Sequence, residues 1–292
     1  QFGGIGAELH KARPGDPLVI WRVFDGSPAQ KAGLRSGDVI RGVDGKDISG
    51  RTATEAVNLI RGTVGTPVRL EIVSPGQSSS HTVVVLRGQI QPPIVEYHML
   101  PNHVGYVQIY GFNQDTAGAL QGALNSLDGQ GATAWVIDLR DNGGGLLDSV
   151  TQVLSMFLPK DTPLYYLTDN TGKRTAYTAD GSIRARIPPI VVLTNDGTAS
   201  GAELFAAGLS EHGLAQTVGE KSAGCVGTGQ LFPLSDGSGL QVTVANMVTG
   251  TGESLNRVGL TPKYPVSMGL QDLLAGKDPQ LEKAVQVLAG RT

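Results

Sequence analysis

Ser200 is the residue of this sequence best suited to nucleophilic chemistry. It lies in residues 195–203, Asn-Asp-Gly-Thr-Ala-Ser-Gly-Ala-Glu, after an apolar run that predicts a buried strand. A serine at the start of a helix is most often an N-cap. The competing interpretation is a nucleophile whose Oγ projects from the turn, with the N–H of Gly201 helping to hold an oxyanion. The segment is not the Gly-x-Ser-x-Gly motif of esterases, because Thr198 and Ala202 occupy the glycine positions.

A run of three glycines follows a second apolar run. Residues 138–148 read Asp-Leu-Arg-Asp-Asn-Gly-Gly-Gly-Leu-Leu-Asp and connect a predicted buried strand to a predicted helix. Glycines at a helix start expose N–H donors, which bind phosphate or hold the oxyanion of an acyl-transfer intermediate. The phosphate interpretation is the weaker one, because no Gly-Lys-Ser/Thr sequence follows. A purely structural turn is the alternative.

A third glycine segment opens the chain. Residues 2–6 read Phe-Gly-Gly-Ile-Gly and precede the first clear strand. Adjacent glycines turn the backbone tightly and leave N–H groups free, so Gly4, Ile5 and Gly6 are candidates to receive a peptide carboxylate. A neighbouring strand edge would pair with the backbone of that peptide. An ordinary glycine turn is the alternative.

Composition excludes several classes of function. The 40% of hydrophobic residues is enough to bury a core, and the net charge of −3 gives no basic surplus for nucleic acid. No stretch approaches the roughly 18 apolar residues of a membrane span. Cys225 is the single cysteine, which excludes an internal disulfide and a multi-cysteine metal site. No metal or organic cofactor is implied.

Two domains must position these segments, and the boundary is predicted near residue 90. Residues 1–90 predict short strands with one or two helices, the first a short helical turn at 29–32. Residues 91–292 alternate strand and helix, which favours a mostly parallel sheet covered by helices. In the first domain we expect strands at 17–24, 38–44, 68–73 and 82–86, and a helix at 53–61. In the second we expect strands at 103–109, 134–140, 190–194 and 241–247, and helices at 117–127, 146–158, 199–209 and 278–288.

The motifs and their order resemble a known family. Residues 27–45 are similar to the central signature of PDZ modules, and an Asp-Leu-Arg-x-Asn-x-Gly-Gly segment and an Asn-x-x-x-Ala-Ser-x-x-Glu segment follow. A Val-Gly-Glu-Lys turn and a Gly-Leu-Thr-Pro segment come next. This order resembles the carboxyl-terminal processing (tail-specific) serine peptidases over nearly the whole chain. The resemblance implies an α/β fold with a PDZ domain and a crotonase/ClpP-like ββα-spiral protease core.

The resemblance also implies roles for particular residues. Ser200 is the nucleophile by position, and Gly144 and Gly201 supply the oxyanion N–H groups. Glu203 matches the acidic residue of the serine motif. Arg61, at the end of the predicted helix at 53–61, lies in an Ile-Arg-Gly-Thr-Val-Gly pattern shared with the family and is a candidate partner for a peptide carboxylate. The family further implies substrates with accessible C-termini and a periplasmic, secreted or other cell-envelope location.

One position departs from the family pattern. The family carries a catalytic lysine 25 residues after the serine, and that position here is Cys225. A buried lysine loses its proton readily and serves as a base, whereas a thiol does not act in the same way. Lys221, four residues upstream, is one substitute base, and a histidine such as His103 or His98 is another. Loss of activity, or direct participation of Cys225, are the remaining alternatives.

We therefore expect a serine endopeptidase that recognises substrate C-termini through its PDZ domain and uses a non-standard base. The rival interpretation is a catalytically impaired peptide-binding scaffold of the same family. A crotonase-like acyl-CoA enzyme is a third possibility, which the PDZ signature disfavours.

Overall fold

The computed structural model describes residues 2–11 and 15–290, which form two compact units. The first unit comprises residues 1–93 together with residues 268–279, and the second comprises residues 94–267 and 280–292. The sequence predicts the boundary at residue 90 and assigns everything beyond it to the second domain. Segment 268–279 differs from that expectation, because it packs with the first unit. In the described residues, no helix is both long and apolar enough to cross a membrane.

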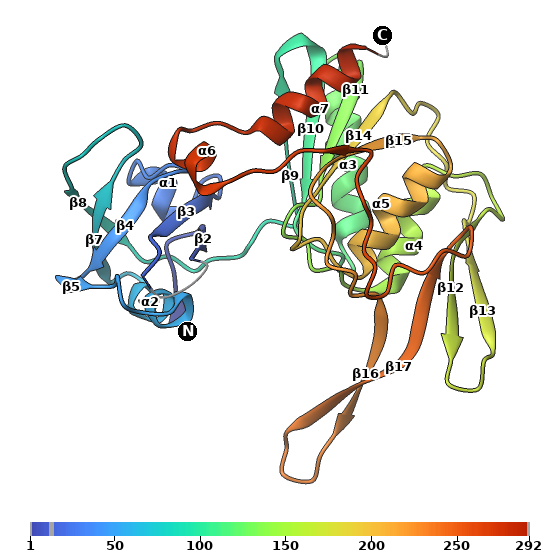
Figure 1. Ribbon diagram of the computed structural model, residues 1–292, viewed down its shortest axis with the longest axis horizontal. Helices are drawn as coiled ribbons and strands as arrows, with labels where there is room; N and C mark the ends of the chain where they lie inside the picture. Colours follow the sequence, from blue (N-terminus) through green and yellow to red (C-terminus); the bar gives the residue numbers. More distant parts are fainter. Residues whose placement is uncertain (1, 12–14, 291–292) are drawn as a thin grey trace. The chain divides into compact units, whose positions relative to one another are not determined.

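An antiparallel sheet forms the first unit (Figure 1). Its strand order is β2 (Ala7–His10), β3 (Leu18–Val23), β4 (Val39–Val43), β7 (Pro67–Val73) and β8 (His81–Leu86), with β5 (Lys46–Asp47) beside β4. A separate pair joins β1 (Phe2–Gly3) to β6 (Gly62–Thr63). Strand β2 is an edge strand, so one row of its backbone groups has no neighbouring strand in the sheet.

Two helices of the first unit begin at defined caps. Helix α1 (Pro28–Lys31) follows the N-cap Ser27, and α2 (Ala53–Ile60) follows Thr52, which forms a capping box with Glu55. Helix α2 buries Ala56 and Ile60 in a core that includes Ile40 and Leu70 of the sheet. The alternation of buried and exposed residues along β7 fits a strand with one face on this core.

A short helix from the C-terminal part of the chain completes the first unit. Helix α6 (Leu270–Leu274) brings Leu273 into a small apolar cluster with Val19 and Val39. The contact is close, since a Cβ atom on Gly37 would lie 2.5 Å from the carbonyl oxygen of Leu273. The sequence analysis did not foresee this helix.

The second unit is built on a mostly parallel sheet of six strands. The order is β18 (Tyr264–Pro265), β15 (Ala215–Gly219), β14 (Ile190–Thr194), β11 (Ala134–Asp138), β10 (Val104–Ile109) and β9 (Val95–Leu100). Only β9, which a 3₁₀ turn (Pro101–His103) connects to β10, runs antiparallel to its neighbour. All residues of β10, β11 and β14 are buried, as expected of strands covered on both faces.

Helices cover both faces of this sheet. Helices α3 (Thr116–Gly129), α4 (Leu147–Ser155) and α5 (Gly201–Glu211) pack on one face, in the core that contains Val107, Trp135 and Phe205. Helix α7 (Pro279–Ala289) covers the other face through Ala284 and Leu288. The parallel strands and these helices match the predicted α/β organisation.

A second, antiparallel sheet has the order β13 (Arg174–Thr178), β12 (Pro163–Asp169), β17 (Gly239–Thr249) and β16 (Gly227–Pro233). Figure 1 shows β16 and β17 as a long hairpin that extends from the unit. The sequence analysis predicts a strand at 241–247 but misses β12, β13 and β16. It also extends the helix at 146–158 beyond its observed end at Ser155.

Candidate functional site

Ser200 occupies the N-cap position of α5 in an uncommon backbone conformation. Its φ and ψ are 54° and −121°, a left-handed region that a residue with a side chain rarely adopts. The side chain is half-buried and makes no capping hydrogen bond. Such strain costs on the order of 1–3 kcal/mol and persists only where the surroundings impose it. The Oγ of Ser200 therefore does not cap α5, although the Ser200 N–H donates to Glu203 Oε2 as in one half of a capping box.

Hydrogen bonds between two loops impose this conformation. Asn195 and Asp141 form a reciprocal pair, in which the Asn195 Nδ2 and the Asp141 N–H each donate across 2.9 Å. The Ala199 N–H donates to the carbonyl of Asn142 at 2.9 Å. Both loops leave the carboxyl ends of neighbouring parallel strands, β11 and β14, so the sheet brings them together.

The glycine loop at residues 143–145 lies directly against Ser200. A Cβ atom on Gly144 would lie 2.7 Å from the Ser200 Cβ and 2.8 Å from the Gly201 nitrogen, so no larger residue fits there. Gly144 and Gly145 also have φ values of 95° and 146°, which favour glycine. The sequence therefore places the glycines correctly beside the serine.

The hydrogen bonds change which amide is available. The N–H of Gly144 donates to Asn142 Oδ1 at 2.9 Å, so it is occupied, contrary to its predicted role as an oxyanion donor. No acceptor among the described residues receives the N–H of Gly145 or of Gly201. These two amides are neighbours, since a Cβ on Gly201 would lie 3.6 Å from the Gly145 nitrogen. The glycine run itself was the sequence signal for Gly145, and the hydrogen bond from Gly144 to the Asn142 side chain distinguishes Gly144 from Gly145.

Glu203 ties Ser200 to the loop that contains Cys225. The carboxylate is fully buried, and its Oε2 accepts the N–H of Ser200 at 3.0 Å and the N–H of Cys225 at 3.0 Å. Its Oε1 accepts the Ser222 hydroxyl at 2.5 Å and the Gly224 N–H at 2.8 Å. Four donors satisfy the buried charge. The sequence analysis matched Glu203 to the family motif but did not find this role.

The shared oxygen fixes how close Cys225 lies to Ser200. Two separations of 3.0 Å to one atom place the two backbone nitrogens no more than 6.0 Å apart. Cys225 is exposed, so its thiol is accessible to solvent. Lys221 begins the same loop and is also exposed. The structure therefore brings Ser200, Cys225 and the two glycine amides together, with Lys221 on the adjoining segment.

The histidines lie elsewhere. His103 ends the turn before β10, at the amino ends of the parallel strands, whereas Ser200 follows the carboxyl end of β14. Strands of this length span roughly 17 Å, so His103 is wrong as the base. His98 stacks 4.8 Å from the ring of Tyr106, on the face of the sheet that α7 covers. His212 lies at the far end of α5, and the described parts contain no cluster of acidic, histidine and cysteine side chains that could hold a metal ion.

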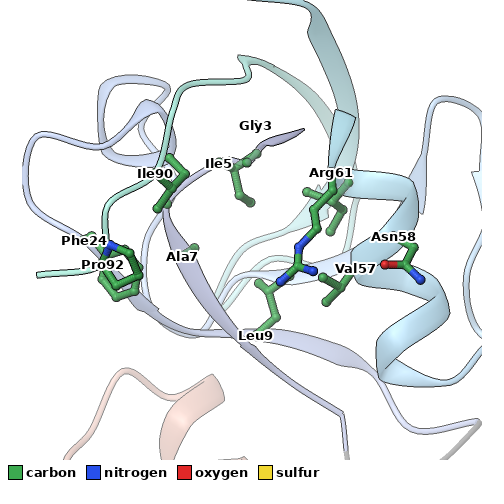
Figure 2. A pocket seen from close by; sticks show the side chains of 13 residues that line it. Gly3, Ile5, Ala7, Leu9, Phe24, Val57, Asn58, Arg61, Ile90 and Pro92 are labelled. Carbon is green, nitrogen blue, oxygen red and sulfur yellow. The ribbon is translucent and has the colours of Figure 1, made fainter. Parts of the chain in front are cut away.

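The first unit contains a groove of about 770 Å³ (Figure 2). Leu9, Val57 and Ile60 give it an apolar wall, and the exposed Arg61 lines it at the end of α2. The glycine loop at residues 3–6 lines one end. Edge strand β2 and helix α2 contribute to the same groove, which suits an extended peptide added beside β2.

The predicted carboxylate donors are only partly available. The Gly4 N–H donates to the carbonyl of Gly88 at 2.9 Å, so Gly4 is not a free donor as predicted. The N–H groups of Ile5 and Gly6 reach no acceptor in the described ranges. Ile5 and Gly6 therefore remain available as backbone donors at this groove, which the guanidinium of Arg61 also lines (Figure 2).

Both units of the structure match families of known proteins. Residues 103–266 match the profile of Peptidase family S41, and residues 19–74 match that of a PDZ domain. The carboxy-terminal processing protease CtpA of Bacillus subtilis is 35% identical over 92% of this chain, and the carboxyl-terminal-processing protease of Synechocystis sp. is 32% identical over 99%. The chain spans 57% and 69% of the length of these two relatives.

A solved structure supports the same grouping. The photosystem II D1 C-terminal processing protease is 31% identical, with a TM-score of 0.60 over 98% of this chain and 76% of that one. Together with the profile matches, which fall in both units, these likenesses show that the chain belongs to peptidase family S41, with a PDZ domain in its first unit.

Proposed function

We propose that the protein is a serine endopeptidase. It holds the C-terminal tail of a substrate polypeptide in the groove of the first unit, and Ser200 attacks a peptide bond of that substrate. The observation that carries the proposal is the Ser200 turn. A strained serine without a capping bond lies beside two backbone N–H groups that have no acceptor in the described part of the chain. A capping or purely structural serine needs neither feature.

The chemistry follows from this geometry. Ser200 Oγ attacks the carbonyl carbon of the scissile peptide, and a base takes the hydroxyl proton. The negative charge that develops on the carbonyl oxygen is stabilised by the N–H groups of Gly145 and Gly201. The leaving amine takes a proton and departs, and water then hydrolyses the acyl-enzyme. The mechanism uses only side chains and backbone amides of this chain.

Lys221 is the base in this proposal. It is the lysine on the loop that Glu203 ties to Ser200, and position 225, where the family has its lysine, holds Cys225. Its amine must shed a proton before it can accept one from Ser200, and burial is the usual means of promoting this. Lys221 is exposed here, so hydrolysis requires the loop or the bound substrate to cover it.

Hydrolysis of a loosely folded protein with an apolar C-terminus tests the proposal. Ser200→Ala lowers the rate by about 10³-fold or more, and Lys221→Ala lowers it by roughly 10²-fold. Lys173→Ala, at another exposed lysine of the second unit, serves as the control and leaves the rate unchanged. Hydrolysis that survives Ser200→Ala rules out the serine mechanism, and an unchanged rate in Lys221→Ala removes Lys221 as the base.

A second candidate is supported by a specific observation. Cys225 lies where the family has its lysine, which favours a peptide-binding scaffold that has lost hydrolysis. Such a scaffold binds free C-terminal peptides but cleaves no unfolded protein at any concentration of the scaffold.

Both candidate functions include a cell-envelope location and polypeptide partners. Fractionation of the source cells tests the location.

A further inference from the structure

The segment that leaves the first unit forms part of its groove. Ile90 and Pro92 line the groove together with Phe24. Figure 2 shows these three side chains on one side and Leu9, Val57 and Arg61 on the other. Residues 89–93 directly precede the second unit in sequence. A segment that only connects two domains is not expected to line a ligand site, so the position of these residues suggests a further role.

Ile90 packs on the glycine loop itself. A Cβ atom on Gly4 would lie 3.2 Å from the Ile90 Cγ1, and one on Gly6 would lie 3.3 Å from the Ile90 Cδ1. A side chain on either glycine would therefore crowd Ile90, which occupies the space beside both of them. The contact fixes the loop from the side opposite the helix.

Backbone hydrogen bonds hold the same segment to the loop. Gly4 and Gly88 exchange two bonds, N–H to carbonyl in each direction, both at 2.9 Å. Gly88 is two residues before Ile90, so the bonds and the side-chain contact act on one short stretch. Ile5 and Gly6, whose N–H groups are free of acceptors in the described ranges, lie immediately after Gly4.

We propose that Ile90 is a positioning residue of the peptide site, which holds the loop at residues 3–6 so that the Ile5 and Gly6 amides receive a terminal carboxylate. This inference rests on the proposed binding function of the groove. The ligand class is a polypeptide ending in an apolar residue with a free carboxylate, since the groove offers apolar side chains and backbone donors. Because the contact is mutual, a bound carboxylate also stabilises the conformation of residues 88–92.

The test uses the full chain and a fluorescent octapeptide that ends in leucine, as the free acid and as the amide. Hydrogen bonds to a charged acceptor are worth enough that the parent chain prefers the acid by about tenfold or more. Ile90→Ala weakens binding of the acid by roughly fivefold and lowers the acid-over-amide ratio by roughly threefold. Loss of apolar contact alone would weaken both peptides equally and leave that ratio unchanged.

Two further variants separate positioning from folding. Ile90→Leu keeps the side-chain volume and restores the ratio, and Ile94→Ala, four residues later and outside the groove, leaves it at the parent value. Hydrogen exchange supplies an independent readout, in which the acid but not the amide slows exchange of the Gly88 amide. Parent-like affinity and ratio in Ile90→Ala would overturn the inference while leaving the groove as a peptide site.

Failure of the proposed function gives different results. A parent chain that binds neither peptide removes the groove as a tail-binding site and this inference with it. A parent chain that binds the acid but cleaves no protein contradicts only the proposed hydrolysis, and Ile90 can still be judged from the binding data.

Discussion

The glycine loop at residues 3–6 and the glycine loop at residues 143–145 use the same physical device in two units. Each loop has one glycine amide that already has an acceptor, since Gly4 donates to Gly88 and Gly144 donates to Asn142. In the described part of the chain, the N–H groups of Ile5 and Gly6 in the first loop, and of Gly145 and the nearby Gly201 in the second unit, have no acceptor. In the proposed function the first loop only binds an anion, beside the apolar side chains of the groove. The second would support a reaction, which also needs a side chain that accepts a proton.

This difference shows which parts of a site depend on single side chains. The backbone donors are set by dihedral angles and loop packing, and they are present in both units. The proton acceptor depends on one residue, and at its family position this chain has Cys225. We therefore expect binding in the first unit to be complete and catalysis in the second to be limited by the base.

The largest expected effect comes from placing an amine at position 225, which would remove the difference between the two units. Cys225→Lys should raise kcat/KM by about 10²-fold or more, because general-base catalysis contributes 10²–10⁴-fold. The single, exposed cysteine also permits a chemical version, in which 2-bromoethylamine alkylates the thiol to give a lysine-like amine. The 2-bromoethanol adduct is the matched neutral control. No gain from either amine would mean that the Ser200 geometry itself is incompetent.

A pair of glycine substitutions should separate the two loops. Gly144→Ala places a Cβ 2.7 Å from the Ser200 Cβ, and Gly6→Ala places one 2.5 Å from the Ser27 Cβ, both at positive φ. The strain predicts a loss of roughly tenfold or more in the function of each loop. Gly144→Ala should lose hydrolysis and keep peptide affinity, and Gly6→Ala should lose peptide affinity and keep hydrolysis of a short ester. Parallel losses in both assays would show that the loops are not independent.

Glu203→Gln should lower the free energy of unfolding of the second unit and leave that of the first unit unchanged. An amide offers one acceptor oxygen, so two of the four donors now face an N–H group instead of the carboxylate. Leaving such groups unsatisfied costs about 1–3 kcal/mol in the free energy of unfolding. Urea denaturation measures this cost, and Glu211→Gln at the other end of α5 is the control. An unchanged free energy of unfolding would contradict the stabilising role of the Glu203 hydrogen bonds between Ser200 and the loop that contains Cys225.

The last expected effect, which appears only at alkaline pH, is a loss of stability in the second unit. Burial raises the pKa of Tyr165 from 10.0 to about 12, because the phenolate loses solvent, although a hydrogen bond from Thr151 opposes the shift. The unfolded chain therefore releases this proton first. Stability is retained below about pH 10 and falls as pH rises towards 12, by no more than about 2–3 kcal/mol.

Tyr165→Phe tests the alkaline effect. The variant should lose this part of the decline in unfolding free energy, as measured by urea denaturation over the same pH range. The first unit contains no tyrosine, so its transition provides the internal comparison. An identical alkaline decline in the variant would assign the effect to another group.

Much of this architecture follows from local sequence patterns. The apolar runs at 134–138 and 190–194 are long enough and apolar enough to predict buried parallel strands, and such strands bring their following loops to one edge. The pairing of Ser200 with the glycine run was implied by the family resemblance, and the shared edge of these strands is its structural reason. The PDZ signature likewise predicts the groove between an edge strand and α2.

Other features depend on contacts that no local pattern encodes. The choice of Gly145 over Gly144 depends on where the Asn142 side chain points, and the role of Glu203 depends on three residues that lie 19 to 22 positions later. His103 was a reasonable base by residue type, but strand direction places it at the wrong edge. The hairpin of β12 and β13 is partly exposed, so its apolar alternation is weak.

Helix α6 has a consequence for the order in which the chain is made. Residues 94–267 must be synthesised after the first unit's strands before Leu273 reaches its place over Val19 and Val39. A nascent chain therefore carries that uncovered apolar patch until residues 268–279 have been synthesised, and the first unit reaches its final stability only after that point.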